Sequence, residues 1–172
     1  MTWTIAPAEP CDAVAITRVI NAAYRVEDFF KVGDRTDVRE VAEFFLTDTF
    51  LAARNEDDDI VGAVRVSIHG QKGHFGMLSV TPEIQGTGLG RALIEAVEAY
   101  CAERGCTAVD LEVASPRTEL PDFYRKFGYE VCGEGEWPAE ARDQLKFPAH
   151  FIVMSKPITV SRIAPSANSA RA

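Results

Sequence analysis

The sequence lacks the features that would place it in a membrane, in a disulfide framework or at a zinc site. No apolar run approaches the roughly 20 residues that span a bilayer, and no basic residue precedes an apolar segment at the N-terminus. The four cysteines form no Cys-x-x-Cys pair and have no histidine at zinc-ligand spacing. We therefore expect a cytoplasmic protein with free thiols, no bound metal and no membrane partner.

Positive charge is also scarce. Lysine and arginine number 18 against 26 aspartates and glutamates, which gives a net charge of −8. A negative protein repels the phosphate backbone of nucleic acids, so we expect no nucleic-acid partner. A field of this sign favours a cationic substrate such as an amine.

The length of 172 residues fits one domain with a sizeable core. We expect residues 1–158 to form a single domain. Residues 159–172 are small and polar, and we expect them to form a disordered tail.

A glycine-rich stretch in the middle of the chain organises the rest. An apolar strand is expected at residues 75–80, followed by a Thr81-Pro82 break and by Gly86, Gly88 and Gly90. A helix follows, with apolar residues at three- and four-residue steps: Leu89, Leu93, Ile94, Val97 and Tyr100. Glycines let a ligand approach the backbone, and the N–H groups at a helix start attract anions. This pattern predicts a ligand that bears a pyrophosphate.

Two well-known glycine loops are excluded by the residue that follows Gly90. Arg91 stands where a P-loop needs lysine and where the GxGxxG dinucleotide fingerprint needs its third glycine. The remaining pattern is Q/R-x-x-G-x-G/A, at residues 85–90. On this motif the chain resembles the GCN5-related N-acetyltransferase (GNAT) family. The resemblance implies a three-layer α/β/α fold with a mixed, mostly antiparallel sheet of six to seven strands, and acetyl-CoA as cosubstrate.

The resemblance assigns acetyl-CoA binding to two segments. The backbone of Leu78, Ser79 and Val80 is expected to pair with the pantetheine arm, as an added strand would. The loop residues expected to hold the phosphates are Gln85, Gly86, Thr87, Gly88, Leu89, Gly90 and Arg91. Arg117 stands where many members of the family have an asparagine that contacts coenzyme A. We expect Arg117 to be a candidate replacement for that contact.

A second family signature, Y-x-K-x-G-F/Y, begins at Tyr124 and ends at Tyr129. In the resembled family this tyrosine hydroxyl lies close to the sulfur of coenzyme A. A phenol is protonated at neutral pH, so Tyr124 can donate a proton to the departing thiolate. The alternative is that Tyr124 only packs against the sheet.

The attacking amine must lose a proton, and Glu112 is the candidate base. In the strand at residues 108–114, Asp110 and Glu112 alternate with apolar residues and point to the opposite face. A strand covered on both faces has little reason to bury a carboxylate unless it is used or paired. The alternatives are a carboxylate that reaches solvent or a lysine, and Glu83 or a water relay as the base.

Acceptor contacts are expected from two loops. The segment 25–37 has neither helical nor strand periodicity, and the resemblance places it over the acceptor groove, with Phe29, Phe30, Lys31, Asp34 and Arg35 as candidate contacts. The alternative is a solvated loop whose phenylalanines enter the core. Trp137, Phe147 and His150 are second-rank candidates from the loop before the last strand.

The remaining elements follow from periodicity. Helices are expected at residues 12–24, with Val14 among the apolar positions, and at 38–47. Strands are expected at residues 2–5, 49–54, 60–68, 129–132 and 150–154.

Together these features predict an acetyl-CoA-dependent N-acetyltransferase that moves the acetyl group directly to a primary amine of a small molecule or peptide. Two alternatives stay open: a non-catalytic acyl-CoA sensor, and transfer of a different acyl group. The family resemblance makes a homodimer an expectation. The sequence leaves the acceptor unidentified.

Overall fold

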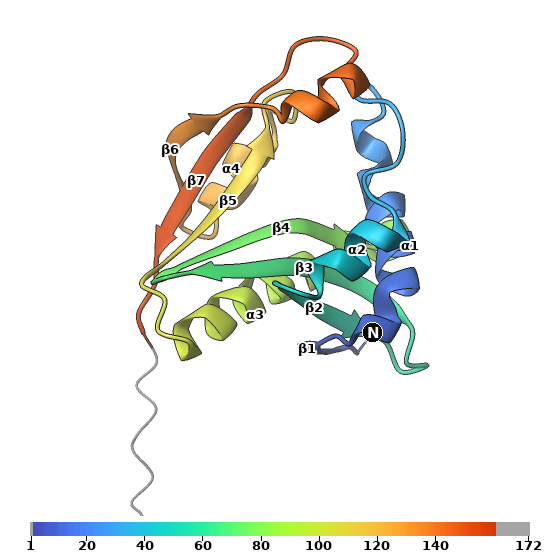
Figure 1. The fold of residues 1–172 in the computed structure, drawn as a ribbon. Helices are drawn as coiled ribbons and strands as arrows, with labels where there is room; N and C mark the ends of the chain where they lie inside the picture. The colour runs from blue at the N-terminus through green and yellow to red at the C-terminus, as the bar shows by residue number, and fades with distance from the viewer. Residues whose placement is uncertain (1, 161–172) are drawn as a thin grey trace, which may run out of the picture.

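A computed structural model describes residues 2–160, which form a seven-stranded mixed sheet with helices on both faces (Figure 1). The predicted fold class is confirmed. The strands run in the spatial order β1-β2-β3-β4-β5-β7-β6; their bounds are β1 (Thr4–Pro7), β2 (Thr49–Arg54), β3 (Ile60–His69), β4 (Lys72–Val80), β5 (Ala108–Ala114), β6 (Glu130–Gly135) and β7 (Phe151–Pro157). Of the predicted disordered tail, residues 161–172 lie outside the described residues.

Two helices lie on each face of the sheet. One layer holds α1 (Ala13–Tyr24) and α2 (Val38–Phe44), whose apolar residues pack against β2, β3 and β4. The other layer holds α3 (Leu89–Glu103) and α4 (Leu120–Arg125), which enclose the larger core. Four short 3-10 helices connect these elements: η1 (Pro10–Asp12), η2 (Arg25–Glu27), η3 (Pro82–Ile84) and η4 (Ala139–Gln144).

The sheet opens into a V at its centre, as the diverging β4 and β5 in Figure 1 show. These two strands are parallel neighbours only from Lys72↔Ala108 to Phe75↔Leu111. Beyond that point β4 pairs with β3, and β5 pairs with β7. The sheet therefore has two arms, joined at the start of β4 and β5.

Local sequence explains where the helices begin and end. Ile16, Val19 and Ile20 of α1 are fully buried or nearly so, at the expected three- and four-residue steps. The Asp37 side chain caps α2 by accepting a hydrogen bond from the backbone N–H of Glu40 at 2.8 Å. After α3 the chain turns at Gly105, whose φ of +82° is readily adopted only by glycine.

Several predicted boundaries were wrong. The first strand covers Thr4–Pro7 instead of residues 2–5, because an edge strand tolerates a proline at its end. Val14 is 66% exposed and lies outside the apolar face of α1. β4 begins three residues earlier than predicted, at Lys72, because the turn before it is tighter. The last strand covers Phe151–Pro157 instead of residues 150–154.

Within residues 2–160, no helix is both long and apolar enough to cross a bilayer.

Candidate active site

The open side of the V leaves one edge of β4 without a neighbouring strand. Beyond Phe75 the described residues give β4 no partner on the β5 side, and Leu78, Ser79 and Val80 lie on this edge. The pairing with β3 shifts register opposite Val64, and Met77 adopts a φ of +54°, so the strand bulges there. This edge presents unpaired backbone groups, which an extended amide-bearing ligand can bind as an additional strand would.

The glycine loop lies at the end of this edge, between β4 and α3. Gly86 and Gly88 have φ values of +79° and +95°, a conformation that side chains with a Cβ rarely adopt. A Cβ built at Gly86, Gly88 or Gly90 meets no atom within 4 Å, so the surface above the loop is open. Gly88 is the N-cap of α3 and provides no side-chain cap. The first turn of α3 therefore offers its N–H groups to an anion.

The side chains of the loop are mostly engaged with its own backbone. The Gln85 amide donates to the Val80 carbonyl at 3.1 Å, and the Thr87 hydroxyl donates to the Ile84 carbonyl at 2.7 Å. Leu89 is buried in the core. Arg91 is exposed, and its guanidinium lies 5.3 Å from the centre of the Phe127 ring. The loop is therefore shaped by its side chains and offers a ligand mainly backbone groups and Arg91.

Tyr124 lies on α4, near the C-terminal end of this short helix. Its ring is buried in edge contacts with Phe75, Phe123 and Tyr129, at centroid distances of 6.0, 5.1 and 6.2 Å. Burial raises the pKa of the Tyr124 phenol, and the neighbouring Tyr24 adds to this effect. The hydroxyl is therefore protonated at neutral pH and can act as a proton donor.

Glu112 is exposed and lies on the face of β5 opposite to the buried residues Leu111 and Val113. The argument that this carboxylate would be buried was wrong, because no helix covers that face of β5 within the described residues. Leu111 and Val113 point into the core that contains Tyr124, whereas Glu112 points to the other face of β5, where its Oε1 lies 3.3 Å from the position of a Cβ built at Gly135 on β6. The two candidate groups therefore lie on opposite faces of β5, and the Glu112 carboxylate extends toward β6.

Two loop segments pair through their backbones and close the wide end of the V; we call this pairing the strap. The backbone of segment 30–32 pairs with that of segment 144–146 through Val32 N–H to Gln144 O and Lys146 N–H to Phe30 O, each 2.8 Å. In Figure 1 the η2 segment and the η4 segment meet at this point. The strap ties the loop after α1 to the loop before β7, so both predicted acceptor loops lie at the same end of the gap.

The structure separates the two phenylalanines of the first acceptor loop. Phe29 is 54% exposed, whereas Phe30 is fully buried. Phe30 meets Trp137 edge to face at 6.2 Å, and Trp137 stacks on Phe151 at 4.6 Å. The Phe30 side chain therefore anchors the strap, and Phe29 remains free for a ligand. Trp137, Phe147 and His150 line one cavity of about 460 Å³ beside the strap.

A buried polar cluster lies on the inner side of the strap. Glu27 is almost fully buried, and its carboxylate pairs with the Arg117 guanidinium at 3.3 Å. Burial raises the pKa of Glu27, and the positive charges of Arg117, Arg35 and Lys31 oppose this rise. Burial also raises the pKa of Tyr24. The Arg117 Nε donates to Glu119 at 2.7 Å, so both Nε and Nη1 of its guanidinium are engaged in ion pairs with carboxylates.

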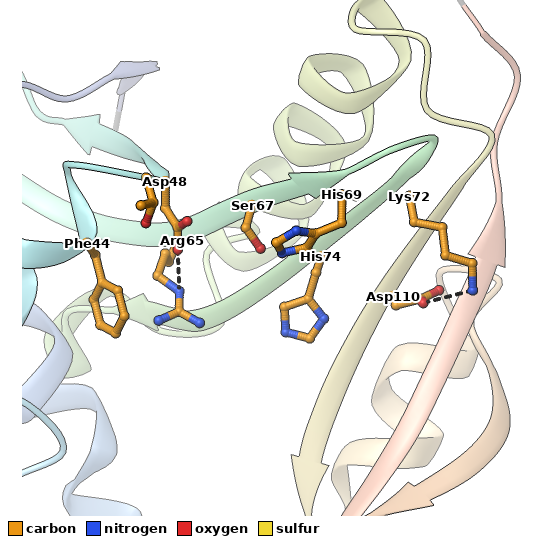
Figure 2. Close-up of a pocket in the computed structure, with 10 residues that line it drawn as sticks. Phe44, Asp48, Arg65, Ser67, His69, Lys72, His74 and Asp110 are labelled. Atoms are coloured by element: carbon orange, nitrogen blue, oxygen red, sulfur yellow. Dashed lines mark hydrogen bonds and ion pairs between the residues drawn. The ribbon is translucent and has the colours of Figure 1, made fainter.

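The part of the α1/α2 face of the sheet that these helices leave uncovered, called the open face below, contains a cavity of about 470 Å³ that sequence reasoning missed (Figure 2). Figure 2 shows the Arg65 guanidinium and the His74 ring extending to the same side of the strands, with Asp110 beside them. Burial lowers the pKa of His74, and the charge of the nearby Glu112 opposes this shift. The sequence pattern that could have predicted this cavity is the alternation of polar residues along β3, which places Arg65, Ser67 and His69 on one face of the strand.

Comparisons with known proteins agree on one family. Residues 19–129 match the Acetyltransferase (GNAT) family. The peptidyl-lysine N-acetyltransferase YjaB of Escherichia coli is 31% identical over 110 residues, which cover 63% of this chain and 69% of that protein. A mycothiol acetyltransferase of Paenarthrobacter aurescens is 29% identical over 99 residues, which cover 54% of this chain and 31% of that protein.

Solved structures of acetyltransferases have a similar fold. The crystal structure of a ribosomal-protein-alanine N-acetyltransferase from Escherichia coli superposes with a TM-score of 0.73 at 18% identity, covering 93% of this chain and 96% of that one. At this identity the likeness concerns the fold. The family match covers more than half of the chain and includes β4, the glycine loop and Tyr124. The chain therefore belongs to the GNAT family of acetyltransferases.

Proposed function

We propose that this protein transfers an acetyl group from acetyl-CoA directly to a primary amine of a small molecule or peptide. One observation carries the proposal: the free edge of β4 leads to an uncapped helix start through a glycine loop with open space above it. This arrangement matches a ligand with an amide-bearing arm at one end and a diphosphate at the other.

Positioning is the first contribution to catalysis. The pantetheine amides pair with the edge at Leu78 and Val80, and the diphosphate rests on the N–H groups of residues 86–91. The thioester then lies in the gap between β4 and β5. Holding the thioester and an amine together in one gap removes much of the entropic barrier of a two-substrate reaction.

Proton transfer is the second contribution. The amine nitrogen forms a bond to the thioester carbonyl carbon, and the C–S bond then breaks. Glu112, directly or through water, accepts the proton that the amine loses, and it releases that proton to solvent from its exposed position. Tyr124 donates its hydroxyl proton to the departing thiolate. Each proton transfer contributes roughly 10²–10⁴-fold in general experience.

Direct transfer fits better than an acyl-cysteine route. Cys101 and Cys106 are fully buried in the core under α3. Burial raises the pKa of the Cys101 thiol to about 12. A buried thiol that stays protonated at neutral pH is a poor nucleophile.

The test combines calorimetry with a thiol-release assay. We expect acetyl-CoA to bind in calorimetry, and release of the coenzyme A thiol when a diverse library of primary amines is added, with the acetylated product identified by mass spectrometry. Acetyl-CoA binding without release across the library would point to the sensor alternative. Faster turnover with a longer acyl-CoA would assign a different acyl group.

Other sequence-based predictions stay predictions. These are the single domain at residues 1–158, the cytoplasmic location, the homodimer, and the absence of nucleic-acid, membrane and metal partners.

A further inference from the structure

Two basic side chains inside the strap have no acidic partner. Lys31 is 8% exposed, and its Nζ donates to the backbone carbonyl of Asp34 at 3.1 Å. The guanidinium of Arg35, which is half-buried, lies 5.4 Å from the centre of the Tyr24 ring. Within residues 2–160, neither side chain forms an ion pair with a carboxylate. Buried charges are normally paired, so two unpaired cations in one place need an explanation.

The carboxylates around them are already engaged. Glu27 pairs with Arg117 at 3.3 Å, and Asp34 pairs with Arg25 at 3.0 Å. Glu40 accepts a hydrogen bond from the Thr36 hydroxyl. These carboxylates keep their negative charges, so Lys31 and Arg35 are distinguished by the absence of a direct ion pair and not by a local excess of positive charge.

A third cation belongs to the same region. Arg65 on β3 pairs through Nε with Asp48 at 3.4 Å and stacks on Phe44 at 4.0 Å, which fixes its position at the edge of the open-face cavity. Burial lowers the pKa of Arg65, and the positive charge of Arg35 lowers it further. Burial and the charge of Arg35 likewise lower the pKa of Lys31. The positive charge of Arg35 thus disfavours the charged forms of both other cations.

The loop that carries the unpaired cations is held in place. The backbone N–H and carbonyl of Thr36 bind the Asn21 side chain of α1 at 3.1 and 2.9 Å. On the other side, the strap fixes the backbone at residues 30–32. Lys31 and Arg35 are therefore presented on an anchored segment, which is what recognition of a ligand group requires.

The cations lie next to the proposed transfer site. Arg35 lies over the ring of Tyr24 at the end of α1, and the backbone of Lys31 belongs to the strap that closes the wide end of the V. Both cations therefore lie at the acceptor end of the gap. An anion held at Arg35 would belong to a molecule whose other end reaches the gap between β4 and β5.

We propose that the acceptor is an amino carboxylate whose carboxylate is bound by Lys31 and Arg35 while its amine enters the gap. This inference rests on the proposed function and narrows it. The planar guanidinium of Arg35 suits a two-oxygen anion, and a nearby ammonium adds a point charge. The acidic net charge of the chain favours a cationic acceptor, whereas the local cluster selects a zwitterion with a free carboxylate.

The test compares matched acceptors on the full chain in the thiol-release assay. The panel contains the L-α-amino acids, their carboxamides, the decarboxylated amines and the corresponding aminophosphonates. We expect amino acids to react and their amides and decarboxylated amines to show a kcat/KM lower by roughly 10- to 100-fold, the effect of losing a charge-assisted contact. The aminophosphonates report whether the site accepts any oxyanion or specifically a carboxylate.

Substitutions of Lys31 and Arg35 then test whether these two side chains bind the carboxylate of the acceptor. Arg35→Gln and Lys31→Met should raise KM for the carboxylate acceptor roughly tenfold or more and reduce the preference over the amide, because each removes one charge-assisted contact. The affinity for acetyl-CoA, measured by calorimetry, should not change. Arg25→Gln is the matched control, because Arg25 lies in the same segment with its side chain exposed and paired to Asp34.

The outcomes separate this inference from the proposed function. Equal or faster acetylation of amides and decarboxylated amines would overturn the amino-carboxylate inference and leave the transferase intact. No turnover of any carboxylate acceptor, with acetyl-CoA bound, would also overturn it. A drop in acetyl-CoA affinity in Arg35→Gln would reassign the cluster to coenzyme A. Failure of acetyl-CoA to bind the unmodified protein would instead reject the proposed function itself.

Discussion

The two ends of the gap differ in the groups that they offer to a ligand: one end offers mainly backbone groups and the other mainly side chains. On the proposed coenzyme side, the free edge of β4 and the first turn of α3 offer backbone groups, and the loop side chains bind their own backbone. On the proposed acceptor side, the candidate contacts are charged and aromatic side chains such as Arg35 and Phe29, on a segment held by the strap. A backbone-built site is insensitive to most substitutions, whereas a side-chain-built site can change its ligand through one residue.

The largest effect that tests this division should come from Tyr124→Phe. Removing the hydroxyl leaves the thiolate without its proton donor, so we expect kcat to fall by about 10³-fold. The ring contacts remain, so calorimetry should show an unchanged affinity for acetyl-CoA. Tyr100→Phe is the control, since the Tyr100 hydroxyl is bonded to Thr49 at 2.8 Å on the far part of α3. An unaltered kcat would remove Tyr124 from the mechanism.

Glu112→Gln should lower kcat by about 10²-fold, at the low end of general-base effects, because water has access to this exposed position. Raising the pH should recover part of the rate, since the free amine then arrives without its extra proton. Glu130→Gln, an exposed change on β6, provides the comparison. Equal rates for Glu112→Gln and the unmodified enzyme across the pH range would assign deprotonation to another group.

Gly88→Val tests the coenzyme side. The residue needs a φ of +95°, and a β-branched side chain would distort the loop and displace at least two N–H groups. We expect the affinity for acetyl-CoA to fall roughly 100-fold, since losing two charge-assisted hydrogen bonds costs about 3 kcal/mol. Gly70→Val introduces similar backbone strain in the turn before β4, where φ is +62°. If both variants bind acetyl-CoA equally well, the loop does not hold the diphosphate.

The smallest predicted effect is the change of folding stability with pH that His74 on the open face causes. The folded protein lowers the pKa of His74, so the unfolded chain binds the proton more readily. The contribution of His74 to the free energy of unfolding is therefore fully present above its unfolded pKa of about 6.5, and it is lost as the pH falls below that value. The groups that act on His74 are Glu112, Asp110, Arg65 and His69.

His74→Gln should make the thermal midpoint less sensitive to pH between 7.5 and 5.5, while Gln71→Ala, a change of a non-titrating side chain in the adjacent exposed turn, should not. Differential scanning fluorimetry at several pH values measures both. An identical pH slope in His74→Gln and the unmodified protein would show that His74 does not carry this dependence.

The strand, glycine loop and helix of the proposed coenzyme side could be predicted from the sequence because their signal is local. Gly86, Gly88 and Gly90 lie within five residues, and the strand and helix on either side have clear periodicity. The backbone conformation that the motif requires is the one the structure has. Tyr124 followed from a second compact motif, and the structure packs its ring against Phe75 of β4.

The acceptor side could not be predicted in the same way because its members come from separate parts of the chain. Glu27, Arg65 and Arg117 lie on η2, on β3 and after β5, and only the strap and the V bring them together. The exposure of Glu112 depends on which face of β5 lacks a helix, and no pattern within the strand encodes that. Phe29 and Phe30 are adjacent and alike in type, yet one is exposed and the other anchors the strap.

A crystal structure with bound acetyl-CoA tests the central claim most directly. We expect the diphosphate within hydrogen-bond distance of the backbone N–H groups of residues 86–91, the pantetheine amides paired with the edge of β4 at Leu78 and Val80, and the thioester between Tyr124 and Glu112. Acetyl-CoA bound in the open-face cavity beside Arg65 and His74, with the glycine loop free of phosphate, would contradict the account.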